Sequence, residues 1–406
     1  MQSVRRRLIP LCLSFVLFSS ASAAAENDSA IAPPSLFPIP AGLEPAVEFW
    51  KKVFSEFGMA QLVYFDPLDM SKIYEVTDVG EENRPKEYID AERARIAAAH
   101  GVDIERVKAQ RGIKERTAAG IKRSGRYIAR IRQIFQENGL PPELTFLPIV
   151  ESSYEINARS SSGAVGIWQF MPRTGKRYLR IGRGIDERKD PLEASRAAAA
   201  FLNEAYERLG SWPLAITAYN YGPAGVGRAV EAVGSDNLMD LIQKYDHRYW
   251  GFPSKNFYAE FLAAVEIGSD LERYFPGLEM DAPVEIKEVA VKRNTSLTAL
   301  ASSFKLNRDQ LLGWNPALSP STRVVPAGYR VKLPTDRSVE PLVVLAKNSG
   351  ETKEKPRVVH HRVRRGDTLY DIAKRYGASV HHIARVNGLR QSQILRVGTT
   401  LRIPQI

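Results

Sequence analysis

The sequence predicts a mainly α-helical protein that ends in two small βααβ units. Between residues 45 and 277, apolar residues recur at spacings of three and four, as they do on amphipathic helices. The last third of the chain contains an internal repeat, and each copy reads as strand, helix, helix and strand. With 406 residues, 44% of them hydrophobic and 25% charged, the chain is long enough for two or three globular domains.

The N-terminus has the pattern of a secretory signal peptide. Three arginines at positions 5–7 precede an apolar segment over 8–18, and small residues follow up to Ala23. This segment is too short for a permanent membrane helix, so we expect residues 1–23 to be cleaved and the protein to be exported without an integral membrane segment. The single cysteine, Cys12, lies inside the apolar segment, which predicts a mature chain without a disulfide or lipid anchor.

The charge balance indicates an anionic partner. The formal net charge of +11 falls to +8 once the three signal arginines are removed. A basic exported protein suits phospholipid headgroups or an acidic cell-wall polymer. Nucleic acid is not expected, because the chain has no Lys/Arg block with interleaved aromatic residues.

A lead-in and a helical extension are predicted to precede the main helical domain. Residues 24–44 are rich in Ala, Pro and Ser and read as a flexible lead-in, and the helical N-terminal extension covers 45–138. The elements expected in the extension are a helix over 48–57, an extended piece over 62–65 and a basic helical stretch over 87–137 that is broken near Gly101, Gly112 and Gly120.

The main domain is predicted to span residues 139–277. It begins with Gly-Leu-Pro-Pro over 139–142, where a helix can start because proline is tolerated in the first turn of a helix but not deeper. Pro148 is expected to kink this helix, and Glu151 would lie near its C-terminal end. Further helices are expected over 191–209, over 212–219 and from about 257 to 269.

Glu151 comes directly after an apolar run and is the candidate general acid. A carboxyl held against apolar side chains loses hydration of its charged form, so its pKa rises and it can carry a proton near neutrality. The alternative is a half-exposed residue that only ends a helix. The nearest rival carboxyl is Glu155, and no acidic residue lies between Ile156 and Arg183 or between Trp212 and Val230.

The repeat predicts two modules joined by a linker. The first copy covers 284–335, the linker 336–357 and the second copy 358–405. The aligned segments are Val363–Leu369 with Val291–Leu297, Ile372-Ala373 with Leu300-Ala301, Tyr376 with Phe304, Ile383 with Leu311, Asn387 with Asn315, and Leu401–Pro404 with Val331–Pro334.

Three blocks of the main domain carry a family resemblance. They are ESSY from Glu151, GAVGIWQFMP over 163–172 and AYNYGP over 218–223. In this order they resemble the lytic transglycosylases of the soluble-transglycosylase superfamily, most closely the membrane-bound type D branch with its LysM repeats. The resemblance covers about residues 45–275 and implies a lysozyme-like (α+β), mainly helical catalytic domain.

The second copy of the repeat independently resembles a LysM module. Its matching residues are Gly366, Asp367 and Thr368 at the turn into the first helix and Asn387 before the last loop. Such modules bind the N-acetylglucosamine-containing glycan of cell walls. The first copy has Asn294-Thr295 where Gly-Asp is expected, which leaves open whether this degenerate module binds glycan.

The resemblance implies cleavage of peptidoglycan without water. Glu151 would protonate the oxygen that links N-acetylmuramic acid to N-acetylglucosamine, and would then take the proton of the muramic C6 hydroxyl. The product would be a 1,6-anhydromuramyl end. Because no second acidic residue accompanies the motif blocks, one carboxyl is expected to act first as acid and then as base.

The resemblance also assigns substrate-binding roles. Ser160 and Gln169 would offer neutral hydrogen bonds to sugar groups, and Tyr219 would hydrogen-bond Glu151 or the substrate. Asn220 would either orient the substrate acetamido group or cap its own helix. For the rings of Trp168 and Phe170, core packing and substrate stacking both stay open.

The last helix of the domain departs from the family pattern. The family often reads Asn-Tyr-Val where this chain has Asn256-Phe257-Tyr258, so the tyrosine hydroxyl is missing at Phe257. Tyr258 would replace it only if the helix were rotated.

The expected partner is the peptidoglycan glycan strand, in the periplasm of a Gram-negative envelope. No cofactor or metal is expected, because neighbouring histidines such as His360-His361 and His381-His382 come without acidic or cysteine ligands. The sequence identifies no protein partner. Two alternatives to the transglycosylase are a muramidase-type hydrolase on the same fold and a non-catalytic wall-binding scaffold.

Overall fold

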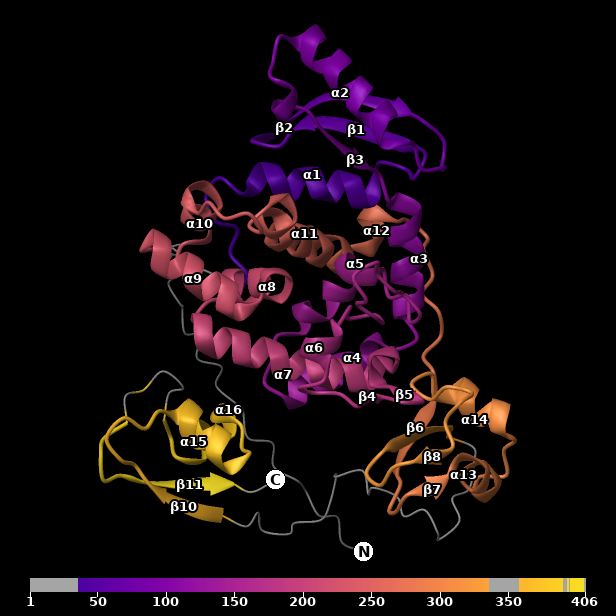
Figure 1. Ribbon diagram of the computed structural model, residues 1–406, viewed down its shortest axis with the longest axis vertical. Helices are drawn as coiled ribbons and strands as arrows, with labels where there is room; N and C mark the ends of the chain where they lie inside the picture. The colour runs from indigo at the N-terminus through magenta and orange to yellow at the C-terminus, as the bar shows by residue number, and fades with distance from the viewer. Residues whose placement is uncertain (1–35, 336–357, 390–392, 394, 405–406) are drawn as a thin grey trace, which may run out of the picture. The chain divides into compact units, whose positions relative to one another are not determined.

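The computed structural model describes residues 36–335, 358–389, 393 and 395–404, and the mainly helical class is confirmed (Figure 1). The predicted signal peptide, most of the lead-in and the 336–357 linker lie outside these residues. No helix in the described part of the chain has both the length and the hydropathy needed to cross a bilayer.

The N-terminal extension contains a three-stranded antiparallel sheet as well as helices. β1 (Gln61–Asp66) lies between β2 (Asp69–Asp78) and β3 (Lys108–Arg111). The helical segments around them are α1 (Glu44–Ser55), α2 (Lys86–His100) and η1 (Ile104–Arg106). The predicted extended piece is confirmed as β1, but an all-helical reading of the remainder was wrong for β2 and β3.

The burial of β1 explains why two polar segments become strands. Val63 and Phe65 enter the main core, whereas Leu62 and Tyr64 face a second core under α2. Since neighbouring residues of a strand point to opposite faces, β1 is buried on both sides and needs hydrogen-bonding partners at both edges. β2 and β3 supply them, although neither segment shows an apolar strand pattern of its own.

In the main domain, α8 packs against both α7 and α11, and all three helices contribute to the core (Figure 1). Its elements are α3 (Lys114–Ser124), α4 (Ile128–Glu137), η2 (Pro142–Phe146), α5 (Leu147–Ser152), α6 (Pro172–Gly175), β4 (Ile181–Gly182), β5 (Ile185–Asp186), η3 (Glu187–Lys189), α7 (Pro191–Leu209), α8 (Trp212–Tyr221), α9 (Pro223–Val233), α10 (Leu238–Lys244), α11 (Phe252–Ser269) and α12 (Leu271–Tyr274). Asp190 caps α7 by accepting hydrogen bonds from Leu192 N and Glu193 N, which explains its predicted start. α9 and α10 were not predicted.

Both copies of the repeat form the predicted βααβ arrangement. The first contains β6 (Ile286–Ala290), β7 (Thr295–Ser296), α13 (Leu297–Ser303), α14 (Arg308–Trp314), β8 (Val324–Val325) and β9 (Arg330–Pro334). The second contains β10 (Val358–Arg362), α15 (Leu369–Tyr376), α16 (Val380–Val386) and β11 (Thr400–Pro404). Each copy has its own hydrophobic core.

Gly120 allows α3 to approach the chain immediately after Glu151. A Cβ atom at Gly120 would lie 2.8 Å from the Cβ and 2.8 Å from the carbonyl oxygen of Ser153. Backbone cannot move aside as the end of a flexible side chain can. We therefore predict that Gly120→Ala lowers the free energy of unfolding by about 1–3 kcal/mol, as overpacking does.

Gly227→Ala is the matched control, because a Cβ atom there would meet only the Arg208 guanidinium, at 3.4 Å. It lies inside α9, so it should be neutral or stabilise by up to about 1 kcal/mol. Urea unfolding of both variants measures the difference. Equal stabilities for the two would contradict a close packing of α3 on Ser153.

Candidate active site

Glu151 lies in the last turn of α5, as predicted. Pro148 falls within the first two positions of α5, and the preceding residues form the 3₁₀ helix η2. A proline cannot donate the hydrogen bond that would continue one helix through this point, so the segment divides there. Ser153 ends α5 in the left-handed conformation, with φ of 50°.

The turn after Glu151 is strained and is held by several contacts. Ser153 and Tyr154 in this turn have φ of 50° and 58°, values that non-glycine residues rarely adopt. Gln169, in the 163–172 block, has φ of 47°. The Tyr154 hydroxyl donates to the Thr145 carbonyl, and Arg123 Nη2 donates to the Ser153 carbonyl at 2.7 Å. Strained backbone of this kind persists where the surroundings fix it, and it is common at functional sites.

Ser152 connects the helix of Glu151 to the block over 163–172. Its buried hydroxyl donates to the Ile167 carbonyl at 2.8 Å. The two motif blocks are therefore neighbours in space, as a shared site requires.

The Glu151 carboxyl is expected to hold its proton at neutral pH. Burial, and after it the charge of Glu260, raises the pKa of Glu151 to about 8. Within the described part of the chain, no hydrogen bond or cation stabilises the ionised form of this carboxyl. The residue is partly exposed in the last turn of α5, where a substrate can reach it, and its raised pKa suits a general acid.

Glu260 is a second carboxyl at the site, and the expectation of a single carboxyl was wrong in this respect. It lies on α11, which packs against α5, and burial raises its pKa to about 8 as well. Glu260 lies outside the three motif blocks in the sequence. The signal that was missed is a lone glutamate inside the apolar run of α11, the same pattern that singled out Glu151.

Ser160 lies on the loop just before the 163–172 block, and Gln169 lies within that block. Ser160 Oγ accepts the Ala164 N–H at 3.0 Å, and Gln169 Nε2 donates to the Gly166 carbonyl at 2.8 Å. Among the described residues, the Ser160 hydroxyl proton and Gln169 Oε1 have no partner, so one donor and one acceptor are available to a ligand.

Trp168 and Phe170 are core residues. Trp168 is fully buried, stacks on Phe135 with ring centroids 5.5 Å apart, and donates its indole N–H to Ser195 Oγ at 2.8 Å. Phe170 is 3% exposed. Of the two roles left open by the sequence, core packing is the one that the structure supports.

Tyr219 lies close enough to Glu151 to feel its charge. Burial, and secondarily the charge of Glu151, raises the pKa of Tyr219 well above its usual value. Its hydroxyl donates to the Trp168 carbonyl at 2.8 Å rather than to Glu151. The ring stacks in parallel on Phe257, with centroids 6.4 Å apart.

Asn220 is exposed at the end of α8. Its Oδ1 accepts the Ser254 hydroxyl at 2.8 Å, which links α8 to the start of α11 and leaves the amide N–H₂ group toward solvent. The side chain therefore does not cap its own helix. Tyr258 donates to the Pro38 carbonyl at 2.9 Å, so it does not replace the hydroxyl missing at Phe257.

The residues singled out in the second module build its framework. Gly366 has φ of 90°, and Asp367 accepts the Arg364 N–H at 2.8 Å and pairs with His361 at 2.7 Å. His361 is buried, whereas the neighbouring His360 is exposed. The remaining two positions also have hydrogen bonds: Thr368 caps α15, and Asn387 bonds the backbone of Ile383 and Arg402.

No group of three or more His, Cys, Asp or Glu side chains in the described ranges could hold a metal ion.

Comparison with known proteins relates these blocks to one enzyme class. The family model for the transglycosylase SLT domain matches residues 130–241, and the model for the LysM domain matches residues 361–404. Membrane-bound lytic murein transglycosylase D of Escherichia coli (strain K12) is 29% identical over 290 residues, which cover 66% of this chain and 61% of that protein. The chain thus spans about three fifths of the length of this curated relative.

Two solved structures are also similar. One is an inactive variant of the lytic transglycosylase Slt of Pseudomonas aeruginosa, with 20% identity and a TM-score of 0.30 over 38% of this chain and 25% of that chain. The other is the soluble lytic transglycosylase of Escherichia coli, with 19% identity and a TM-score of 0.29 over 37% and 25% of the two chains.

The SLT match covers Glu151 and all four predicted substrate-binding residues, and the LysM match covers the second module but not the first. The chain therefore contains a transglycosylase SLT domain followed by a C-terminal LysM domain.

Proposed function

We propose that this protein is a peptidoglycan lytic transglycosylase of the periplasm that is held on the wall by its LysM domain. It cleaves the bond between N-acetylmuramic acid and N-acetylglucosamine and leaves 1,6-anhydromuramyl ends. The observation that carries the proposal is the Glu151 carboxyl, whose pKa of about 8 keeps it protonated at neutral pH inside the SLT domain.

The proposed reaction uses Glu151 twice. The protonated carboxyl gives its proton to the glycosidic oxygen, and the bond from this oxygen to the muramic C1 breaks. The substrate's acetamido group stabilises the cationic centre. The resulting Glu151 carboxylate then removes the proton of the muramic C6 hydroxyl, whose oxygen closes onto C1, so the carboxyl is restored without a water molecule.

The neighbouring polar groups would bind the sugar. Ser160 supplies a donor and Gln169 an acceptor, and the free amide of Asn220 can hold the acetamido carbonyl. Tyr219, which lies close enough to Glu151 to feel its charge, packs its ring in parallel on Phe257.

Glu260 does not favour the hydrolase alternative. A two-carboxylate glycosidase needs one ionised partner to act as nucleophile or base. The pKa of Glu260 is raised to about 8, so this carboxyl is mainly protonated at neutral pH. Its proposed role is to oppose ionisation of Glu151.

Glu151→Gln should reduce lysis of purified sacculi to background, because glutamine keeps the shape of the side chain but cannot give a proton. Mass spectrometry of wild-type digests should find anhydro products, which are one water lighter than hydrolysed ones. Glu155→Gln, which changes an exposed carboxyl four residues away, should keep full activity. Lysis by Glu151→Gln would exclude Glu151 as the acid, and products with reducing ends would indicate a muramidase.

Glu260→Gln should shift the alkaline limb of the pH–rate profile to lower pH. Activity falls as pH rises through the pKa of Glu151, and this pKa is raised partly by the charge of Glu260. Because burial is the larger cause, we expect a shift of about one unit or less. Glu207→Gln, which removes another carboxyl whose pKa burial raises, to about 7, is the control and should leave the limb in place. A limb that stays or moves to higher pH would contradict the coupling.

Deleting residues 358–406 should separate wall binding from chemistry. The truncated protein should lose most of its binding to insoluble sacculi in a pull-down. Its turnover of a short soluble glycan fragment should stay within about twofold of the full chain, because the carboxyls of the site lie on α5 and α11. Undiminished retention on sacculi would contradict anchoring by the LysM domain.

A further inference from the structure

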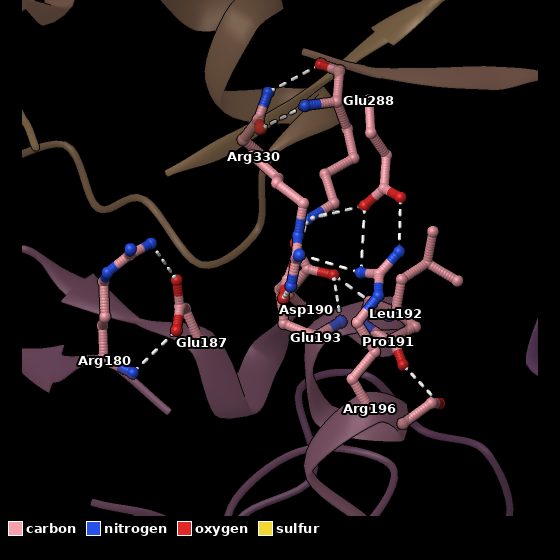
Figure 2. A network of polar contacts seen from close by, with 12 residues as sticks. Arg180, Glu187, Asp190, Pro191, Leu192, Glu193, Arg196, Glu288 and Arg330 are labelled. Carbon is pink, nitrogen blue, oxygen red and sulfur yellow. Dashed lines mark hydrogen bonds and ion pairs between the residues drawn. The ribbon is translucent and has the colours of Figure 1, made fainter. Parts of the chain in front are cut away.

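The first module contacts the main domain through a cluster of six charged residues (Figure 2). Three come from the cap and first turns of α7, and three come from the paired strands β6 and β9 of the module. The six residues, which we call the α7 charge cluster, are Asp190, Glu193, Arg196, Glu288, Arg330 and Lys332. The six residues are three acids and three bases, and Arg130 of α4 adds a fourth base with its Nη2 atom 3.8 Å from Glu288 Oε2.

Lys332 is the centre of the α7 charge cluster. Its side chain is 3% exposed, and Nζ lies 2.6 Å from Asp190 Oδ2, 3.0 Å from Glu193 Oε1 and 3.5 Å from Glu288 Oε1. An ammonium group removed from water this fully requires such partners. Two of the three carboxylates around Lys332, Asp190 and Glu193, belong to the main domain, so this contact between the module and the domain is buried.

Glu193 and Glu288 stay ionised over the whole neutral range. Burial alone would raise the pKa of Glu193, but the hydrogen bond from Arg330 and the charges of Lys332 and Arg196 lower it to about 2. The pKa of Glu288 is likewise lowered, by Arg196 and Lys332, against the effect of burial. The contact should therefore persist throughout the pH range in which the enzyme would work.

The two copies of the repeat differ at this very pair. In the first copy Glu288 is opposite Lys332 across β6 and β9, and Lys332 is buried. In the second copy the corresponding pair is His360 and Arg402, and both are exposed. The sheet position that is exposed to solvent in the LysM domain is thus in contact with the main domain in the first module.

A second contact joins the module to the β4–β5 hairpin. Ile185 and Leu318 form an antiparallel bridge, flanked by hydrogen bonds from Asp186 N to the Ala317 carbonyl at 2.8 Å and from Ser319 N to the Gly184 carbonyl at 3.0 Å. The Thr322 hydroxyl also donates to the Gly184 carbonyl. A loop of the module therefore extends the hairpin as a short additional strand.

Arg188 connects this hairpin to the substrate-binding block. The side chain is buried, and its guanidinium bonds the Asp186 carboxylate through Nε at 2.9 Å and through Nη2 at 2.8 Å. Nη1 donates to the Gly163 carbonyl at 2.9 Å and to the Phe170 carbonyl at 3.0 Å. These two carbonyls bracket the segment that carries Gln169.

We propose that the first module is a fixed brace of the catalytic domain, which positions the substrate-binding block through the β4–β5 hairpin and the positioning residue Arg188. The inference rests on the proposed function. The two copies of the repeat then have different roles, because the LysM domain binds the wall and the first module positions the substrate-binding block.

A disulfide between Ile185→Cys and Leu318→Cys tests the docking. The hydrogen bonds around this pair are those of a non-hydrogen-bonded antiparallel position, where Cα atoms lie about 4.5 Å apart, within the range of disulfides. In a Cys12→Ser background, the bond should form on air oxidation, and the oxidised protein should cleave a short soluble glycan fragment as the reduced one does. Failure to form the bond in folded protein, or loss of turnover on oxidation, would overturn the brace.

A second pair of variants tests the positioning without new cysteines. Thr322→Val deletes a hydroxyl that donates to the Gly184 carbonyl and accepts the Ser319 N–H at 3.1 Å. Thr295→Val deletes a hydroxyl that bonds the Arg293 carbonyl inside the module. For the short fragment, Thr322→Val should raise KM about five-fold, the effect of losing the one hydrogen bond from this hydroxyl to the hairpin, with kcat within about twofold. Thr295→Val should change neither constant.

The outcomes separate this inference from the proposed function. An active wild-type enzyme in which both variants keep the same KM would overturn the brace and leave the transglycosylase intact. A wild-type protein that cleaves no glycan would overturn the proposed function and the positioning role together. In that case the disulfide would report the docking alone.

Discussion

The enclosure of the Glu151 carboxyl is the constraint on which the rest of the site depends. Glu151 is partly exposed, but the protein around its carboxyl limits hydration without supplying a hydrogen bond or a cation from the described residues, so the neutral acid is the favoured form. Several features of the surrounding structure hold this group in position. The strained turn at Ser153 and Tyr154, the Ser152 bond to Ile167 and the close approach of Gly120 all fix the end of α5.

The same constraint gives a reason for the departure at Phe257. A tyrosine hydroxyl that reached Glu151 from this position would favour the ionised form of the carboxyl. Phenylalanine provides only a ring, which packs in parallel on Tyr219. With Glu260 as a second carboxyl of raised pKa nearby, this chain opposes ionisation of its acid by burial and like charge. In the proposed reaction, proton transfer to the substrate leaves Glu151 in its disfavoured ionised form, and uptake of the C6 hydroxyl proton restores the neutral acid.

The sequence could predict the features that local chemistry determines. Asp190-Pro191 starts α7 because the aspartate caps the helix and the proline fits its first turn, and Pro148 divides the helix before Glu151 for a related reason. Features that depend on distant partners were missed. Lys108–Arg111 is a strand only because β1 is buried on both faces, and Glu260 reaches the site only because α11 packs on α5. The docking of the first module could not be predicted either. Lys332 and Arg402 are basic residues at equivalent positions of the repeat, yet Lys332 is buried and Arg402 is exposed.

The most direct test of the central claim is the titration of Glu151 itself. Carboxyl resonances of the folded protein, labelled with ¹³C at glutamate side chains, can be followed from pH 4 to pH 9, and the Glu151 signal is assigned as the one absent from Glu151→Gln. The account predicts a titration step near pH 8 for this signal. A step near 4.5, the ordinary value for a glutamate, would contradict an acid that is kept protonated by burial.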